Sequence, residues 1–481
     1  MSHQLGIQTK KDDDFGNWYS ELVQKSEMVM YSDISGCYPL CPRGYFAWET
    51  IQRILDGRLK SHKVRNCYFP ILISEKVLSK EETHLEGFTP EVAWVTHAGS
   101  KPLEQRLAIR PTSETVIYQQ MGKMIEKDRL PLKLNQWCNV IRWEFRDPTP
   151  FIRSREFLWQ EGHTAHLTEE EATEMTRTMI IEYQHMYHNL LRVPTILGKK
   201  TPTERFAGAD DTYTVEAYIP GCGKSIQAAT SHMLGQNFSK MFNLFVQDER
   251  MKKSYLYQTS WGFTTRSIGI ALMVHSDDTG VILPTDLCET QIVVVPIYRT
   301  KNKETVLEYA GMVSSLLENA DYRVELDLRN KKPGWKYNYW ELRGVPYRIE
   351  VGGRDMEAES VTVCERLNRN KKSVKLDHLL NYIPEFMAEY DEELYIRAEA
   401  KMSDAILINP TGTKEELFEM IKDGKIVYTG WCGSSDCEME VRKNCEAAKS
   451  LCIPERAGFT PSECFCCGEK ADLVCAFGRS L

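Results

Sequence analysis

The sequence predicts an α+β protein of three successive units: a large unit built on an antiparallel sheet, an α/β unit, and a small cysteine-rich α/β unit. Residues 140–166, VIRWEFRDPTPFIRSREFLWQEGHTAH, alternate at the period of β-strands, which predicts a hairpin. From about Leu287 strand and helix patterns alternate, which is typical of an α/β unit. Eight of the fifteen cysteines lie between Cys432 and Cys475. We therefore place the three units at residues 1–286, 287–400 and 401–481.

The composition is that of an ordinary globular protein, with 481 residues, 42% hydrophobic and 27% charged. The formal net charge of -8 excludes a protein that coats nucleic acid through a general positive charge, and we expect no DNA partner. Any contact with RNA must then be local. The sequence shows neither a signal-peptide pattern nor a long apolar run, so we expect a cytoplasmic protein without a membrane partner.

The first elements expected along the chain are a helix at about 17–29, a second helix at 45–62 and a strand at 67–74. On its own, this order is typical of a core helix packed on a core strand. Residues 110–115, RPTSET, then look like a loop that opens a helix, with Thr112 or Ser113 as N-cap. In that position Glu114 could simply interact with the helix dipole.

The hairpin at 140–166 carries an unusual charge pattern, because its arginines stand among aromatic and aliphatic residues: Arg142, Arg146, Arg153 and Arg155. A buried arginine is costly unless it meets an anion, and guanidinium groups beside aromatic rings suit a planar, polyanionic ligand such as a nucleotide. The alternative interpretation is an edge hairpin whose arginines form weak surface ion pairs with Glu144, Glu156 and Glu161.

Several ordered blocks, taken together, resemble one family. IRWEFR with FIRSREFLWQEGH resembles motif 2 of the class II aminoacyl-tRNA synthetases, in the form found in prolyl-tRNA synthetases of the eukaryotic and archaeal type. RPTSET, QAATSHMLGQNFSK (227–240) and SWGFTTRSIG (260–269) look like that family's other active-site blocks, and 45–74 has the layout of motif 1. The likeness covers nearly the whole chain. It implies a class II catalytic domain, an anticodon-binding α/β domain and a zinc-binding C-terminal domain.

The resemblance implies ATP-dependent ligation of L-proline to tRNA(Pro) through a prolyl-adenylate, with release of AMP and pyrophosphate. Arg142 and Arg266 would be the catalytic residues, since they would neutralise the triphosphate, which is bound with Mg²⁺. The implied ATP-binding residues are Arg142, Glu144, Arg153, Ser154, Phe157, Gln227, Thr230, Thr264 and Arg266.

The resemblance also implies a proline pocket, formed by Thr112, Glu114, Arg142, Trp159, Glu161, His163, His232, Ser260 and Gly262. Its chemistry suits the substrate: the secondary ammonium of proline needs an anion, for which Glu114 is the candidate, and the flat ring needs an aromatic wall, for which Trp159 is the candidate. His166 and His275 lie outside the matching positions, and we expect them to be structural.

Residues 168–191 predict a helix with a capping box of Thr168 and Glu171. The spacing of motifs 2 and 3 leaves no room for the large editing domain of bacterial-type prolyl enzymes. Strands are expected at 291–297, 322–329, 346–352 and 360–366, a helix at 303–319, and a charged helix at 376–402. Basic and aromatic residues of the kind that grip splayed-out bases are Lys332, Trp335, Lys336, Arg343, Arg348 and Arg354.

Cys432, Cys437, Cys464 and Cys467 form two close pairs suited to one structural zinc ion. Cys466 is an alternative to Cys467, and independent thiols are the other interpretation. The chain ends at Leu481, where the family usually has a tyrosine, so a role for that ring in the active site is not expected.

Two other functions compete with proline ligation: a synthetase-like regulator without catalysis, and a class II enzyme for another amino acid such as threonine. Such regulators commonly lose an ATP-binding arginine, but Arg142 and Arg266 are both present. Threonyl enzymes hold a catalytic zinc in the pocket, and no metal-binding cysteine occupies the pocket motifs here. Motif 1 usually forms a dimer interface, so we expect a C2 homodimer, which sedimentation at micromolar concentration would detect.

Overall fold

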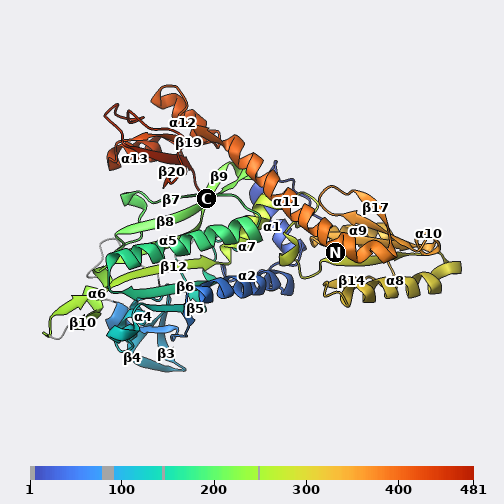
Figure 1. Cartoon of the computed structure of the whole chain (residues 1–481), viewed down its shortest axis with the longest axis horizontal. Coiled ribbons are helices and arrows are strands. Elements are labelled where there is room, and N and C mark those ends of the chain that lie inside the picture. The colour runs from blue at the N-terminus through green and yellow to red at the C-terminus, as the bar shows by residue number, and fades with distance from the viewer. Residues whose placement is uncertain (1–5, 79–91, 144–146, 248–249) are drawn as a thin grey trace.

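The computed structural model describes residues 6–78, 92–143, 147–247 and 250–481. Figure 1 shows an elongated molecule with a large sheet unit, a second unit beside the helix α11 (Leu379–Ala405), and a C-terminal unit at the other end of that helix. No helix among the described residues combines the length and apolar character needed to cross a membrane.

The large unit is built on a predominantly antiparallel sheet whose strands run in the order β1-β5-β6-β12-β9-β8-β7. All neighbouring pairs in this part are antiparallel except β1 with β5. The strands are β1 (Arg65–Asn66), β5 (Leu132–Ile141), β6 (Glu156–His166), β7 (Thr195–Lys199), β8 (Asp211–Ile219), β9 (Lys224–Gly235) and β12 (Tyr257–Thr264). The predicted antiparallel sheet is confirmed.

Smaller elements border this sheet. The strands β2 (Leu72–Ser74), β3 (Trp94–Ala98) and β4 (Lys101–Ile109) form a separate sheet, and β10 (Phe245–Gln247) pairs with β11 (Lys253–Tyr255). The predicted strand at 67–74 is therefore wrong in its first half, where the chain runs without strand pairing to Leu72. Pro70 offers no backbone N–H to a ladder, which accounts for the shorter strand.

Helices bury their apolar faces against the large sheet. They are α1 (Phe15–Lys25), α2 (Pro42–Ser61), α4 (Glu114–Met121), α5 (Glu169–His185), α6 (Asn237–Phe242) and α7 (Arg266–His275). Figure 1 shows α5 and α7 lying on this sheet. Thr168 caps α5 as predicted, because its hydroxyl accepts from the Glu171 amide at 3.2 Å. The carboxylate of Glu171 instead accepts from the Leu167 amide at 3.3 Å, so the reciprocal capping bond to Thr168 is not the one formed.

The predicted hairpin has a much longer connection than expected. β5 ends at Ile141 and β6 begins at Glu156, so Arg142, Arg153 and Arg155 lie in the connecting loop and not on a strand. Pro148 and Pro150 have no N–H for the ladder, which accounts for the early end of the pairing. Arg146 and Glu144 lie outside the described residues.

The second unit has its own sheet, in the order β14-β13-β15-β16-β17. Its elements are β13 (Ile292–Ile297), α8 (Lys303–Glu318), β14 (Val324–Leu326), α9 (Pro333–Leu342), β15 (Tyr347–Gly352), α10 (Gly353–Glu357), β16 (Ser360–Glu365) and β17 (Lys371–Lys375). The strand predicted at 322–329 is shorter, because the chain turns at Asp327. The buried carboxylate of Asp327 accepts from Arg329 at 2.6 Å and from Trp340 at 2.8 Å, which fixes this turn.

The C-terminal unit extends the large sheet. It comprises β18 (Ile406–Ile408), α12 (Lys414–Lys422), β19 (Ile426–Trp431), α13 (Ser435–Asn444), β20 (Ala448–Pro454) and β21 (Leu473–Arg479). β20 pairs with β7 through Ile453 and Lys199, so one sheet of eleven strands runs through both units. The boundaries at 286 and 400 stay predictions.

Candidate active site

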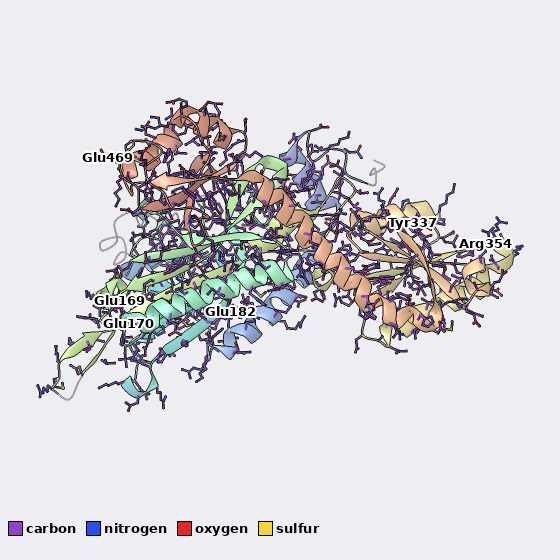
Figure 2. All side chains as sticks on the ribbon, turned by 45° about the horizontal axis from the view of Figure 1, so that its top comes forward. Glu169, Glu170, Glu182, Tyr337, Arg354 and Glu469 are labelled. Carbon is purple, nitrogen blue, oxygen red and sulfur yellow. The ribbon has the colours of Figure 1, made fainter. Side chains whose placement is uncertain are left out.

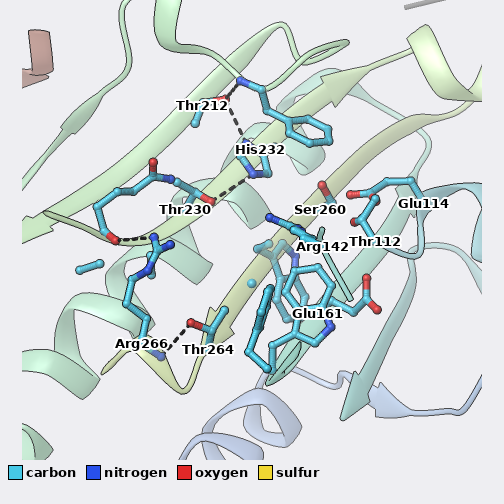
Figure 3. Close-up of a pocket in the computed structure, with 18 of the residues that line it drawn as sticks. Thr112, Glu114, Arg142, Glu161, Thr212, Thr230, His232, Ser260, Thr264 and Arg266 are labelled. Carbon is cyan, nitrogen blue, oxygen red and sulfur yellow. Dashed lines mark hydrogen bonds between the residues drawn. The ribbon is translucent and has the colours of Figure 1, made fainter. Parts of the chain in front are cut away.

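A cavity of about 300 Å³ opens where β6, β9 and β12 meet the start of α4 and of α7. Figure 3 shows Arg142 in the middle of this cavity, with Arg266 and Thr264 on one side and Glu114 and Thr112 on the other. The predicted residues that line it are Thr112, Glu114, Arg142, Ser154, Phe157, Trp159, Glu161, His163, Gln227, Thr230, His232, Ser260, Gly262, Thr264 and Arg266. Segments up to about 150 residues apart in sequence thus form one site.

Two of the predicted ATP-binding residues are not placed in the cavity. Arg153 is exposed and does not line it, although its charge acts on Arg266 from nearby. Glu144 lies outside the described residues. The roles of both residues stay predictions.

The Arg142 side chain is held against aromatic rings. Its guanidinium carbon lies 5.4 Å from the Phe157 ring centre and 5.5 Å from that of Trp159, and the two rings meet edge to face. Its Nε donates to the Pro111 carbonyl at 2.9 Å. The two terminal nitrogens have no hydrogen-bond partner among the described residues, which leaves a planar donor pair for an anion.

Arg266 forms the opposite cationic wall. Its Nε donates to the Ile152 carbonyl and one terminal nitrogen to the Gln227 carbonyl, both at 3.2 Å. Burial lowers the pKa of Arg266, but a guanidinium remains charged at neutral pH. Two fixed guanidinium groups in one cavity without a carboxylate bound to either are a site for an anionic ligand.

Arg142 and Arg153 do not form the surface ion pairs of the alternative interpretation within the described residues. In the described part of the chain, neither Arg142 nor Arg153 pairs with Glu156 or Glu161. The Glu156 carboxylate instead accepts from Asn139 at 2.8 Å. The nucleotide-site interpretation is therefore the better supported of the two.

Glu114 presents a buried carboxylate to the other end of the cavity. It is 4% exposed, and its hydrogen bond is a short one from the Thr112 hydroxyl. No described Lys, Arg or His lies within ion-pair distance of it. A buried carboxylate without a cation is costly, so this position favours a positively charged ligand group. Ser113 stands at the N-cap position of α4, but its hydroxyl donates to Glu161 and does not cap the helix.

Glu161 and His163 are hydrogen-bonded to each other in the lining of the cavity. The Glu161 carboxylate accepts from Gln136 and from His163, each at 3.0 Å, and His163 also meets the Tyr118 hydroxyl at 3.0 Å. Burial alone would raise the pKa of Glu161, but these hydrogen bonds keep that pKa below its usual value. Their contacts are with the protein, which suits residues that fix the shape of the floor.

His232 is a neutral imidazole in the cavity wall. Burial lowers the pKa of His232 to about 3, helped by the charges of His163 and Arg142. Its ring nitrogens meet the hydroxyls of Thr212 at 3.0 Å and Thr230 at 3.1 Å (Figure 3). It therefore acts as a fixed hydrogen-bonding group and not as a proton donor at neutral pH.

Trp159 forms a flat wall because Gly262 leaves room for it. A Cβ atom at Gly262 would lie 3.3 Å from the Trp159 ring. Ser260, on the same strand, has a buried hydroxyl without a hydrogen-bond partner among the described residues. An aromatic wall with one unsatisfied hydroxyl beside it suits a small, partly polar ring.

One part of the cavity lining was not predicted from the sequence. The segment Pro202–Glu204 and the two residues after it bring Glu204, Arg205 and Phe206 into the lining, and Thr212 follows on β8. The Phe206 ring lies 4.6 Å from that of His232. These residues belong to no block that suggested a site.

The comparisons with known proteins cover the whole chain. The description "tRNA synthetase class II core domain (G, H, P, S and T)" matches residues 94–275, "Anticodon binding domain" matches 291–386, and "Prolyl-tRNA synthetase, C-terminal" matches 414–481. The cytoplasmic proline--tRNA ligase of Arabidopsis thaliana is 44% identical over 99% of this chain and 91% of its own length. The chain belongs to the prolyl-tRNA synthetase family.

Solved structures of this synthetase family agree. The crystal structure of prolyl-tRNA synthetase from Cryptosporidium parvum complexed with halofuginone and AMPPNP is similar with a TM-score of 0.94 and 44% identity, covering 99% of this chain and 100% of that chain. The same enzyme complexed with L-proline and AMP gives a TM-score of 0.92 with the same identity and coverage. The predicted family and fold class of a prolyl-tRNA synthetase are confirmed, and these matches do not support the threonine alternative.

Two histidines are structural in this synthetase fold, as expected. His166 meets the Thr164 hydroxyl at 2.7 Å and His275 meets the Leu191 carbonyl at 2.9 Å. Burial lowers the pKa of each to about 4. Neither ring lines the cavity.

Three of the five basic residues proposed to grip bases are committed to contacts within the synthetase. Lys336 donates to the Asp327 carbonyl at 2.6 Å, Arg343 pairs with Glu27, and Arg348 pairs with Glu341 at 3.0 Å. All three are buried, so the expectation that they face RNA is corrected. Lys332 and Arg354 are exposed and Trp335 is half-buried; Figure 2 shows Arg354 at the far end of the second unit.

The four predicted metal ligands of the prolyl-tRNA synthetase come together. The sulfur atoms of Cys432, Cys437, Cys464 and Cys467 all lie within 4.8 Å of one another. Cys432 lies 3.8 Å from Cys437 and 3.8 Å from Cys467. A tetrahedron with Zn–S bonds of about 2.3 Å has edges of about 3.8 Å, so the spacing fits zinc. Cys466 is not part of this group.

Proposed function

We propose that this chain carries out ATP-dependent ligation of L-proline to tRNA(Pro) through a prolyl-adenylate, releasing AMP and pyrophosphate. The observation that carries the proposal is the cavity itself. Glu114, a buried carboxylate with no cation in ion-pair distance among the described residues, lines the same cavity as the Trp159 ring and as Arg142, whose terminal nitrogens have no described partner. The family relationship adds support, because a relative named for its complex with L-proline and AMP shares 44% of the sequence.

On the proline side, Glu114 would bind the secondary ammonium, with Thr112 holding the carboxylate in place. Trp159 would lie against the pyrrolidine ring, and Gly262 would keep that face open. Ser260 and His232 offer polar atoms at the rim, while Glu161 and His163 fix the floor.

On the ATP side, Arg142 would bridge the α-phosphate and the proline carboxylate, and Phe157 would stack on adenine. Arg266 and Thr264 would hold the triphosphate from the opposite wall, with Arg153 and Ser154 toward the outer phosphates. Gln227 and Thr230 would contact the adenosine and the Mg²⁺ that enters with ATP, and Glu144 would read the adenine edge.

The first step joins the proline carboxylate oxygen to the α-phosphorus of ATP and breaks the bond to pyrophosphate. The carboxylate is already ionised at pH 7, so no side-chain base is needed. In the second step, a ribose hydroxyl at the end of the tRNA takes the prolyl group and AMP leaves. The contribution of the protein is orientation and neutralisation of charge by Arg142 and Arg266.

The experiment that tests this function compares amino-acid-dependent exchange of pyrophosphate into ATP with proline, threonine, alanine and cysteine. Proline is expected to support the fastest exchange, because Glu114 and Trp159 suit a secondary ammonium on a flat ring. Exchange that is faster with threonine, or absent with every amino acid, would contradict the proposal and favour the other enzyme or the regulator.

The partners are proposed from several observations. The match of residues 291–386 to an anticodon-binding domain supports binding of tRNA(Pro), and the name of the Arabidopsis relative supports a cytoplasmic location. A C2 homodimer is supported by large apolar side chains of the first 72 residues that are 43–71% exposed, namely Met30, Tyr31, Ile34, Tyr45, Tyr68 and Leu72.

We also propose one structural zinc ion bound by Cys432, Cys437, Cys464 and Cys467. A Cys467→Ser variant should lose most of its zinc, about one ion per chain in the unchanged protein, because three thiolates and a hydroxyl bind zinc poorly. Atomic emission spectrometry of dialysed protein measures the content, and Cys466→Ser is the matched control that should retain it. If Cys466→Ser loses zinc and Cys467→Ser retains it, Cys466 and not Cys467 is the fourth ligand.

A further inference from the structure

The part of the cavity lining formed by Glu204, Arg205 and Phe206 was not predicted from the sequence, and it depends on a short segment of the chain. Pro202–Glu204 forms a single turn, and the residues after it place Phe206 against His232 at 4.6 Å. The Phe206 amide also donates to Thr212 at 3.2 Å, and Thr212 holds His232. The chain after this turn therefore packs against His232 and shares the Thr212 hydroxyl with it.

A turn of three residues does not hold its own position, so its tertiary contacts matter. They come from the C-terminal unit, more than 230 residues later in the sequence. Thr201 and Thr203 donate to the same carboxylate oxygen of Glu438, at 2.8 and 2.6 Å. Glu438 is fully buried, and the Ser450 hydroxyl on β20 bonds to it as well.

A second contact lies one helical turn farther along α13. Arg442 forms a short ion pair with Glu204, and Lys449 on β20 donates to the same carboxylate at 2.9 Å. The Glu204 side chain is 13% exposed and the Arg442 side chain 35%, so solvent screens this pair in part. Glu438 and Arg442 lie four residues apart, so both face the segment from the same side of the helix.

The helix that makes these contacts also carries Cys437 of the cysteine cluster, next to Glu438 in sequence. Figure 1 shows α13 and β20 beside the edge of the large sheet at β7, where the pairing of Ile453 with Lys199 joins the two units. Lys200, just before the segment, donates to the Leu451 carbonyl at 2.8 Å and is buried. The C-terminal unit thus contacts the chain at Lys200, Thr201, Thr203 and Glu204.

We propose that the C-terminal unit shapes the amino-acid end of the cavity, with Glu438 and Arg442 as positioning residues that hold segment 201–206 against His232. The proposal rests on the proposed function for the identity of the ligand. It assigns to α13 a part in proline binding in addition to its place in the cysteine cluster.

The test is an Arg442→Met variant with Lys443→Met as its matched control, since Lys443 is exposed and pairs with Glu440 on the same helix. In Arg442→Met the KM for proline in pyrophosphate exchange should rise about fivefold or more, while kcat changes less than about twofold, because loss of a wall contact weakens binding more than chemistry. The KM for proline of Lys443→Met and of Arg442→Lys should stay close to that of the unchanged protein. A proline KM in Arg442→Met equal to that of the control would overturn the proposal.

Two further measurements separate positioning from general damage. In a Glu204→Gln background, Arg442→Met should add little, because the pair is already broken; full additivity would contradict a direct pair. Amide hydrogen exchange without ligand should accelerate for residues 201–212 in Arg442→Met, and unchanged exchange there would also count against the proposal. Amide hydrogen exchange does not depend on catalysis. If residues 201–212 exchange faster in Arg442→Met while the unchanged protein fails to activate proline, the proposed function is refuted and the positioning of the segment stays supported.

Discussion

Arg142→Ala is expected to slow proline-dependent pyrophosphate exchange by roughly 10³-fold or more while the protein stays folded. The two terminal nitrogens of Arg142, without a partner in the described part of the chain, belong to a guanidinium that lines the cavity against Phe157 and Trp159. In the proposed function they would neutralise charge on the α-phosphate and on the attacking carboxylate. Alanine removes this contact in the transition state, so kcat should fall more than the KM for either substrate rises.

Two further variants make this result specific. Arg142→Lys keeps the charge but loses the planar pair of donors, so its exchange rate should lie well below that of the unchanged protein and above that of Arg142→Ala. Arg129→Ala removes an exposed arginine that pairs with Glu126 on the surface and should change the rate little. Near-normal exchange by a folded Arg142→Ala protein would refute the assignment.

Residues that the sequence blocks singled out line one cavity in the structure, and their roles stay predictions. Arg142 and Trp159 of motif 2 line the same cavity as Ser260 and Arg266 of block 260–269, although the two blocks are far apart in the sequence. Their residue types were informative, because several arginines among aromatic residues are rare without an anion to bind. The family resemblance then supplied the roles that chemistry alone left open.

Long-range packing was less accessible to sequence reasoning. Glu204 and Phe206 reach the cavity because Glu438 and Arg442 hold their segment, and no local pattern indicates a contact across more than 230 residues. The pairing of Ile453 with Lys199, which joins two sheets into one, was missed for the same reason. Local periodicity predicts a strand, but it does not name the partner of that strand.

Charge alone misled the interpretation of the second unit. Lys336, Arg343 and Arg348 look like RNA contacts in the sequence, yet each meets an acidic residue or a carbonyl group inside the protein. Asp327 and Glu27 create that environment for Lys336 and Arg343 from positions that local sequence patterns do not link to them. Exposed Lys332 and Arg354 are the better candidates for contact with RNA.

Glu114→Gln is expected to weaken proline binding by roughly 100-fold or more, because a neutral amide cannot balance a buried ammonium. The size follows from burial: Glu114 is 4% exposed and has no described cation near it, so the ligand would be its only counter-charge there. Isothermal titration with proline measures the loss. The KM for ATP should change little, and Glu126→Gln, which alters an exposed surface pair, is the matched control.

A cycle of variants and ligands makes the test specific for the ammonium. Tetrahydrofuran-2-carboxylate has the ring and carboxylate of proline with an ether oxygen in place of the secondary ammonium. It should bind the unchanged protein far more weakly than proline does, and Glu114→Gln should reduce that large difference to a small one. If the variant discriminates against the ether as strongly as the unchanged protein does, the ammonium is recognised elsewhere. The buried carboxylate would then serve only to hold Thr112 and the start of α4.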